Sequence, residues 1–158
     1  MKKARKSGLL LHPTSLPGPC GIGDIGPAAR AFVDDLVEMG QRVWQVLPLG
    51  PTGYGDSPYQ SLSTFAGNPV LISFDDLVAD GLLDRRRLDS LAAFGQGKIC
   101  YGEVIPARMA ILDTVCRSFM RRASSELRDE FDAYCAAQQA WLDDYALFAA
   151  IKTAFIQC

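Results

Sequence analysis

The sequence is poor in the residues that bind metals or form disulfide frameworks. It contains one histidine, His12, and five widely spaced cysteines, none of them in a CxxC motif. A zinc site and a disulfide framework are therefore not expected, and the single histidine excludes a histidine-rich metal centre within the chain. We predict no metal site, and we interpret the cysteines as free, buried thiols in a reducing cytoplasm.

Strong net charge and long apolar runs are also missing. Sixteen basic and eighteen acidic residues give a formal net charge of −2, which lacks the basic footprint of a nucleic-acid-binding protein. No apolar stretch approaches the roughly 20 residues of a membrane span. The basic residues at positions 2–6 are not followed by the apolar core of a signal peptide. We therefore expect a cytoplasmic protein, with neither nucleic acid nor a membrane as its partner.

The first 47 residues have the pattern of an α/β protein. Residues 7–11 are predicted to form a short buried strand, and the proline- and glycine-rich residues 12–27 a loop. Pro27 is well placed to open an amphipathic helix, and Gly40 to end it. Residues 42–47 predict a second strand. This order predicts a βαβ unit with parallel strands.

The rest of the chain is predicted to be a long loop followed by helices. Residues 48–69 show no periodicity, and loops of this length are usually functional or disordered. Residues 84–105 are predicted to be a polar connection, after which Pro106 opens a long amphipathic helix with Arg108 away from its apolar side. The helical pattern runs to Cys158 without a stop signal, which suggests that the chain is truncated.

Both long loops follow the carboxyl ends of predicted parallel strands, where α/β proteins place their sites. Two glycine-rich runs, at residues 21–26 and 50–55, lack the flanking strand and helix, or the Lys-Ser/Thr pair, of nucleotide-binding motifs. We interpret them as turn glycines. His12, at the end of the first strand, is interpreted as a structural hydrogen-bonding residue rather than as a catalyst.

The second loop brings short polar groups and rings close together in sequence. Asp56 lies beside Ser57 and Tyr59, and rings combined with hydroxyl groups suit sugars, which have apolar faces and polar rims. On these residues alone, the alternative that Asp56 and Ser57 only hold a turn by local hydrogen bonds is equally open. No two carboxylates are placed to oppose each other across a glycosidic bond, so no catalytic residue is predicted.

Three segments resemble one known family. They are GLLLHPTSLPGPCGIGDIG at residues 8–26, WQVLPLGPTGYGDSPYQSLSTFAGNPVLI at residues 44–72, and WLDDYALFAAIK at residues 141–152. The first two strongly resemble the opening of amylomaltases, the disproportionating 4-α-glucanotransferases, and the third resembles a later block of the same family. The likeness covers most of residues 7–77 and 141–152.

The resemblance implies a (β/α)₈ TIM barrel with helical insertions and no cofactor. The barrel would be incomplete here, because a barrel takes roughly 200 to more than 400 residues. We expect residues 1–77 to supply its first two strands and substrate loops, and residues 78–158 a helical insertion truncated at its end. The family transfers α-1,4-glucan segments between maltodextrins with retention, through a covalent glycosyl-enzyme. Its catalytic carboxylates lie on later strands, so the chain alone is expected to be inactive.

The resemblance also implies substrate-binding residues. Ser57 and Tyr59 match residues that line the donor–acceptor cleft, Tyr54 matches a residue of a second, surface glucan site, and Asp56 belongs to the same motif. The alternative function is a non-catalytic glucan-binding module. A phosphosugar enzyme is a third possibility, but residues 7–29 and 43–84 contain no lysine or arginine to bind a phosphate. The oligomeric state is not indicated.

Overall fold

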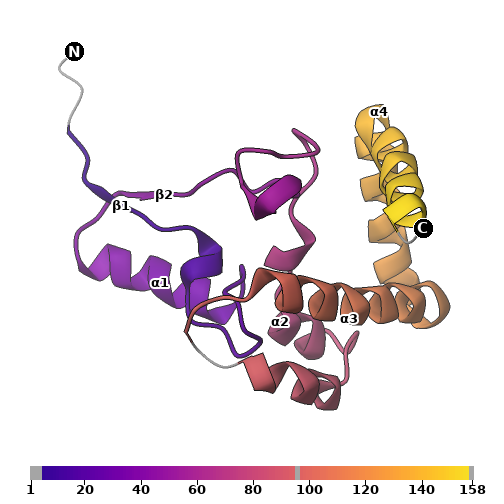
Figure 1. The fold of residues 1–158 in the computed structure, drawn as a ribbon, viewed down its shortest axis with the longest axis horizontal. Helices are drawn as coiled ribbons and strands as arrows, with labels where there is room; N and C mark the ends of the chain where they lie inside the picture. The colour runs from indigo at the N-terminus through magenta and orange to yellow at the C-terminus, as the bar shows by residue number, and fades with distance from the viewer. Residues whose placement is uncertain (1–4, 95–96, 157–158) are drawn as a thin grey trace.

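The structure is a computed structural model that describes residues 5–94 and 97–156, apart from the side chains of Tyr54 and Ile156. A strand pair and the first helix lie at one side, a long helix crosses the middle, and the last helix rises from its far end (Figure 1). The elements in chain order are β1 (Gly8–Leu10), η1 (Pro13–Ser15), α1 (Pro27–Glu38), β2 (Val43–Gln45), η2 (Tyr54–Asp56), η3 (Pro69–Leu71), α2 (Phe74–Ala79), η4 (Arg85–Phe94), α3 (Tyr101–Arg122) and α4 (Ser125–Ile156).

The predicted βαβ unit is confirmed. β1 and β2 pair in parallel, with Leu9 opposite Trp44, and α1 connects them. The helix begins at Pro27, whose fixed φ suits a first helical residue. It is followed by Gly40 at φ 70°, a left-handed conformation that favours glycine and stops the helix.

Trp44 joins the strand pair to α1. Its ring meets the ring of Phe32 edge to face, with centroids 5.1 Å apart, and its indole Nε1–H donates a hydrogen bond of 2.7 Å to the carbonyl oxygen of Leu11. The apolar part of the indole therefore packs on α1, while its N–H binds the residue that follows β1.

The prediction that residues 7–11 form a strand is confirmed at Gly8–Leu10, but the prediction that this strand is buried is wrong. Leu9 and Leu10 are 41% and 58% exposed, and Val43 on β2 is 44% exposed. Within the described residues the sheet has two strands, so nothing covers their outer edges or the face opposite α1. Parallel strands are normally covered on both faces, and these apolar side chains lack that cover.

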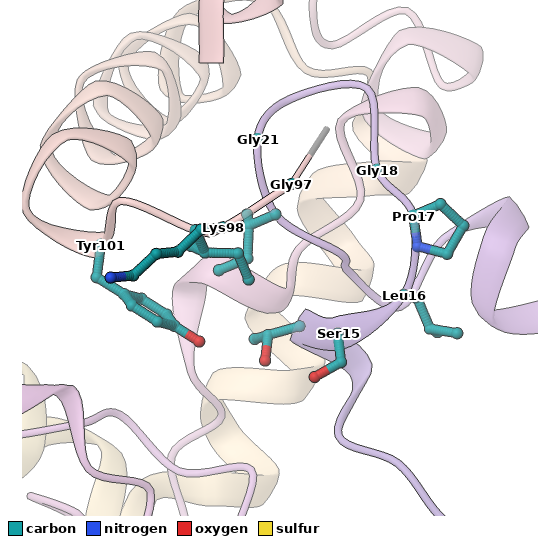
Figure 2. Close-up of a pocket in the computed structure, with 11 residues that line it drawn as sticks. Ser15, Leu16, Pro17, Gly18, Gly21, Gly97, Lys98 and Tyr101 are labelled. Atoms are coloured by element: carbon teal, nitrogen blue, oxygen red, sulfur yellow. The ribbon is translucent and has the colours of Figure 1, made fainter. Parts of the chain in front are cut away.

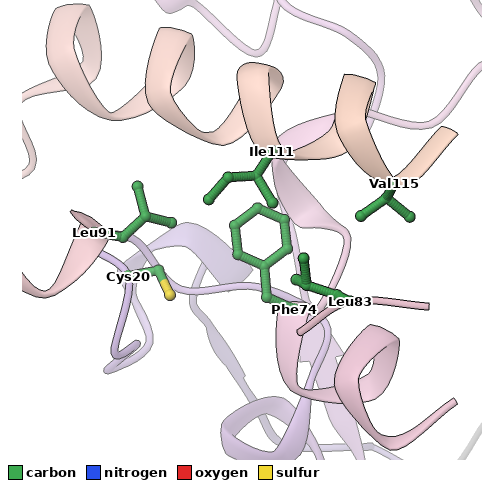
Figure 3. Packing of buried hydrophobic residues seen from close by; sticks show 6 residues of the cluster. All are labelled: Cys20, Phe74, Leu83, Leu91, Ile111 and Val115. Carbon is green, nitrogen blue, oxygen red and sulfur yellow. The ribbon is translucent and has the colours of Figure 1, made fainter. Parts of the chain in front are cut away.

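The hydrophobic core lies among the helices rather than on the sheet. A cluster of buried side chains draws on the loop after β1, on α2, on the turn that follows it, on η4 and on α3 (Figure 3). Its members are Cys20, Phe74, Leu83, Leu91, Ile111 and Val115. The cluster joins residues from both expected parts of the chain, residues 1–77 and residues 78–158. Cys20 is the one described cysteine that is buried, because Cys100 and Cys116 are exposed and Cys135 is half-buried, so the expectation of buried thiols holds for Cys20 alone.

The predicted polar connection at residues 84–105 is wrong over most of its length. Leu88, Leu91 and Phe94 recur every three residues, which is the period of the 3₁₀ helix η4, and all three contact the core. α3 then begins at Tyr101 rather than at Pro106. Pro106 therefore lies inside the helix as its sixth residue, where it cannot donate a backbone hydrogen bond to the carbonyl oxygen of Gly102.

Arg108 is fully buried, which corrects the prediction that it lies on the polar side of α3. Its Nη2 donates to the carbonyl oxygen of Ile72 at 2.6 Å and to Oδ2 of Asp24 at 3.3 Å. Its guanidinium carbon lies 4.0 Å from the centroid of the Phe74 ring, a cation–π contact. The charge is therefore met by a carbonyl dipole, a carboxylate and an aromatic face.

Burial outweighs the attraction between Arg108 and Asp24. It raises the pKa of Asp24 and lowers that of Arg108, although each partner acts in the opposite direction on the other. Nε and Nη1 of Arg108 are buried and have no hydrogen-bond partner among the described residues. The pair therefore connects segments at a cost in solvation, and removing one partner would leave the other as an unpaired buried charge.

α4 is one continuous helix with few contacts to the rest of the described chain. Ser124 caps it, because its Oγ accepts from the backbone N–H of Leu127 at 3.3 Å. Phe119 and Phe131 meet edge to face across the turn between α3 and α4, with centroids 5.5 Å apart. Several large apolar side chains of α4 are exposed: Phe131, Tyr134, Leu147, Phe148, Ile151 and Phe155. No described helix has the length and apolarity required to cross a membrane.

We predict that Asp24→Asn lowers the free energy of unfolding by about 3–5 kcal/mol, because it leaves the Arg108 charge unpaired. The double change Asp24→Asn with Arg108→Met should cost clearly less than the sum of the single changes, because it removes both buried charges. Urea unfolding followed by far-ultraviolet circular dichroism measures both effects. Arg86→Met, which breaks an exposed ion pair with Asp84, is the control and should leave the urea midpoint unchanged. Additive losses for Asp24 and Arg108 would contradict the coupling.

Candidate functional site

The long loop after β2 is held together at its base by backbone hydrogen bonds. The N–H of Asn68 donates to the carbonyl oxygen of Leu49 at 2.8 Å, and the N–H of Leu62 donates to that of Pro51 at 3.0 Å. An antiparallel bridge joins Thr52 to Ser61. The two sides of the loop therefore run together, and the short helix η2 lies at its tip.

The tip contains the predicted site residues in an unusual backbone conformation. Gly55 and Asp56 both have positive φ, 68° and 54°, a region that aspartate tolerates better than most residues. Ser57 Oγ accepts a long hydrogen bond of 3.4 Å from the N–H of Tyr59, so the local bonding considered for this turn is present at Ser57. The carboxylate of Asp56 has no hydrogen bond to any described residue. The side chain of Tyr54 lies outside the described part.

A cavity of about 160 Å³ lies between this tip, the end of β1 and the start of α3. It brings Asp56 together with His12 and Tyr101, which are far apart in sequence. The other lining residues are Thr14, Ser15, Leu47, Thr52, Pro58, Asn68 and Ile105. The two long loops therefore meet at the carboxyl ends of β1 and β2, as the sequence predicted.

Two further cavities adjoin this one. One of about 510 Å³ shares Pro58 with the small cavity and is lined by Tyr59 and by the serine-rich side of the loop. The other, of about 680 Å³, shares Thr14, Ser15 and Tyr101 with the small cavity. Figure 2 shows this larger hollow, with the Tyr101 ring on one side and Ser15 on the other. The three cavities together form a hollowed surface along the two loops.

The predicted site residues are divided among these cavities. Asp56 lines the small cavity and Tyr59 lines the 510 Å³ cavity, and Pro58 lines both. Ser57 lines none of the three. Tyr59 is 73% exposed, which leaves most of its surface available to a ligand.

His12 is the residue whose environment differs most from its prediction. Its Nδ1 is buried and has no hydrogen-bond partner among the described residues, so the interpretation as a structural hydrogen-bonding residue is wrong for this atom. Burial lowers the pKa of the imidazole. The side chain is therefore neutral at neutral pH, inside a cavity that also contains a carboxylate.

Sequence reasoning missed Tyr101 and Lys98. Tyr101 was assigned to a connection, although it is the first residue of α3 and lines two cavities. Lys98, beside it, is the one cation among the residues that line the three cavities. The structure places Tyr101 at the start of a helix, in which the carbonyl oxygen of Cys100 accepts from the N–H of Val104.

The lining suits a polyhydroxylated ligand. Hydroxyl groups, a backbone rich in glycine and proline, and two tyrosine rings can serve both the apolar faces and the polar rims of a sugar. Asp56 is the one carboxylate among the lining residues, whereas glycosidic bond cleavage takes two. In the described part of the chain no group of three His, Cys, Asp or Glu side chains is placed to hold a metal ion.

The far side of the long loop is attached to α4. The rings of Phe65 and Trp141 stack, with centroids 5.8 Å apart and an interplanar angle of 26°. Trp141 Nε1–H donates to Gln138 Oε1 at 2.8 Å, which holds the indole on its own helix. This contact ties the loop that carries Asp56 and Tyr59 to the last helix of the chain.

A parallel βαβ unit with a hollowed surface at its strand ends is typical of an α/β protein, and places its candidate site at the strand-end loops. Comparison with known proteins then gives the family. The profile of the 4-alpha-glucanotransferase family matches residues 11–157, nearly the whole chain. The chain therefore belongs to the 4-alpha-glucanotransferase family.

Individual relatives agree with this assignment. The chain is 51% identical to a 4-alpha-glucanotransferase of Thermus thermophilus and 46% identical to one of Synechocystis, each over 154 residues. It is similar to the solved structure of an amylomaltase from Streptococcus agalactiae in complex with acarbose, with a TM-score of 0.87 and 40% identity over 96% of this chain. In each case the matched part is 98% or 96% of this chain but 30% of the relative.

We predict that Phe65→Ala and Trp141→Ala each loosen the long loop, because an aromatic pair contributes about 0.5–1.5 kcal/mol beyond the burial of its area. The measurement is the rate at which a non-specific protease cuts within residues 48–69. Both variants should be cut faster than the unaltered chain, and the double variant no faster than either single variant. Tyr134→Ala, also on α4, is the matched control. An unchanged cutting rate in Phe65→Ala would show that the stacking does not restrain the loop.

Proposed function

We propose that this chain forms the N-terminal part of a 4-α-glucanotransferase that transfers α-1,4-glucan segments between maltodextrins with retention. The observation that carries the proposal is the long loop at the end of β2, which places Asp56 and Tyr59 on adjoining cavities. Family membership over residues 11–157 supports the reaction, and a solved relative in complex with acarbose supports a sugar ligand. We place this activity in cytoplasmic maltodextrin metabolism.

The proposed architecture is a (β/α)₈ barrel of which β1 and β2 are the first two strands. The exposed apolar side chains on both strands fit positions that neighbouring barrel strands would cover. Residues 78–158 would form the helical insertion, with the other strands in the part of the relatives that this chain does not match. The proposed division at residue 77 separates the barrel part of the chain from the helical insertion. The two parts nevertheless share one hydrophobic core.

The proposed site residues act by binding and orientation. Tyr59 offers an exposed ring to the apolar face of a glucose unit in the donor–acceptor cleft, and Ser57 offers a hydroxyl beside it. Asp56 accepts hydrogen bonds from sugar hydroxyls in the small cavity. Tyr54 belongs to a second, surface glucan site that long substrates reach. Together these contacts hold the glucan against the carboxylates of the rest of the enzyme.

The chemistry itself requires two carboxyl groups on opposite sides of the glycosidic bond. In a retaining transfer, one carboxylate attacks the anomeric carbon as the other carboxylic acid protonates the departing oxygen. An acceptor hydroxyl then displaces the enzyme carboxylate and gives up its proton to the group that had acted as acid. We assign both groups to the rest of the enzyme, and to this chain the exclusion of water and the positioning of substrate, with no cofactor.

The second candidate function is a non-catalytic glucan-binding module. One observation favours it, namely that Asp56 is the one carboxylate lining the three cavities. Such a module would bind maltodextrin with the same loop but would not catalyse a reaction.

We predict that the 158-residue chain alone does not release glucose from maltotriose. The reason is that its cavities lack the second carboxylate that the reaction requires. The assay is glucose release by the purified chain, with the intact Thermus thermophilus relative as positive control. Turnover that persists through repurification would contradict the prediction.

We predict that Tyr59→Ala lowers kcat/KM by roughly 10–100-fold in a chimera that joins this chain to the remaining part of the Thermus thermophilus relative. Ser57→Ala should cost less, about 0.5–1.5 kcal/mol, as expected for one neutral hydrogen bond. Tyr54→Phe should change the kinetics on long glucans more than those on maltotriose. Kinetics of Tyr59→Ala equal to those of the unaltered chimera would reduce the loop to a scaffold.

A further inference from the structure

The small cavity contains a polar group that the proposed binding loop does not use. His12 lies just after β1 and faces the loop tip across a space of about 160 Å³. The walls around it carry hydroxyl, amide and carboxylate groups, from Ser15, Thr52, Asn68 and Asp56. None of the described residues forms a hydrogen bond or an ion pair with the imidazole.

The two nitrogens of the imidazole are in different surroundings. Nδ1 is closed off from solvent and has no partner, whereas Nε2 is not closed off. Nδ1 is unsatisfied in either neutral tautomer, whereas Nε2 can exchange a hydrogen bond with water or a ligand. Nε2 is therefore the nitrogen available to a ligand, and in the tautomer with its proton there it is an N–H donor. Burial supports the neutral form, because it lowers the pKa of His12.

We propose that His12 is a specificity-determining residue of this site, whose Nε2–H donates a hydrogen bond to a hydroxyl of one glucose unit held between Asp56 and Tyr101. This inference rests on the proposed function. The donor on His12 and the acceptor carboxylate of Asp56 are complementary to a pair of sugar hydroxyls, one accepting and one donating. The Tyr101 ring supplies a surface for the apolar face of the same unit.

The size of the cavity limits what it can hold. Pockets for drug-sized ligands usually measure roughly 300–1,000 Å³, and this one is about 160 Å³. It has room for a single sugar unit but not for a longer chain. The adjoining cavities of about 510 and 680 Å³ can take the units on either side. His12 would thus select the hydroxyl pattern of one unit within a longer glucan.

The experiment compares two substitutions in the chimera of this chain with the Thermus thermophilus relative. The amide nitrogen of glutamine in His12→Gln lies as far along the side chain as Nε2, whereas that of asparagine in His12→Asn lies as near as Nδ1. We expect His12→Gln to keep kcat/KM on maltotriose within about 3-fold and His12→Asn to lose about 10-fold, because the second has no donor that reaches the sugar. Thermal unfolding of both variants checks their folding and should give equal midpoints.

The outcomes separate this inference from the function on which it rests. If Tyr59→Ala is impaired while His12→Asn matches the unaltered chimera, His12 does not contact the substrate and the inference is overturned alone. A lower thermal midpoint in His12→Asn than in His12→Gln would assign the kinetic loss to packing and would overturn it as well. If the unaltered chimera transfers no glucose while the intact relative does, the proposed function fails and the inference fails with it.

Discussion

The buried guanidinium of Arg108 joins α3 to two segments that are far from it in the sequence. It reaches the carboxylate of Asp24 in the first long loop, the carbonyl oxygen of Ile72 after η3, and the ring of Phe74 at the start of α2. Each segment leads directly to a wall of the hollowed surface. The first loop leads back to Thr14 and Ser15, η3 leads back to the base of the second loop, and α3 begins at the Tyr101 side. The position of one cation therefore sets how these walls meet.

The sequence predicts those parts of the fold that depend on local chemistry. α1 follows from Pro27 and Gly40, and the order of strand, helix and strand follows from periodicity. The start of α3 and the burial of Arg108 were mispredicted because both depend on partners elsewhere, and the Asp24 carboxylate lies 84 residues away. An arginine on an isolated helix is correctly placed toward water. Only the fold supplies the groups that make its burial tolerable.

The same distinction applies to the site. That the second loop carries ligand-binding groups follows from its length, its rings and its place after a strand. The placement of Asp56 and Tyr59 in different cavities does not follow from the sequence, because neighbours in sequence can face different cavities once the tip adopts positive φ angles at Gly55 and Asp56. The surroundings of His12 are set by residues from four segments, so no local pattern describes them. The family resemblance locates the loop, but it does not show which cavity each residue of the loop lines.

The long reach of the Arg108 contact has a consequence for the order in which the molecule assembles on the ribosome. Residues 8–45 can pair as β1, α1 and β2 soon after they emerge, because their contacts are short in sequence. Asp24 must wait for a partner made 84 residues later, so the first loop leaves the exit tunnel well before this ion pair can fix it. The outer strand edges, which no described residue covers, stand open to other nascent chains from the time they emerge. The walls of the site are thus among the last features of this chain to form, although one of them is among the first to be synthesised.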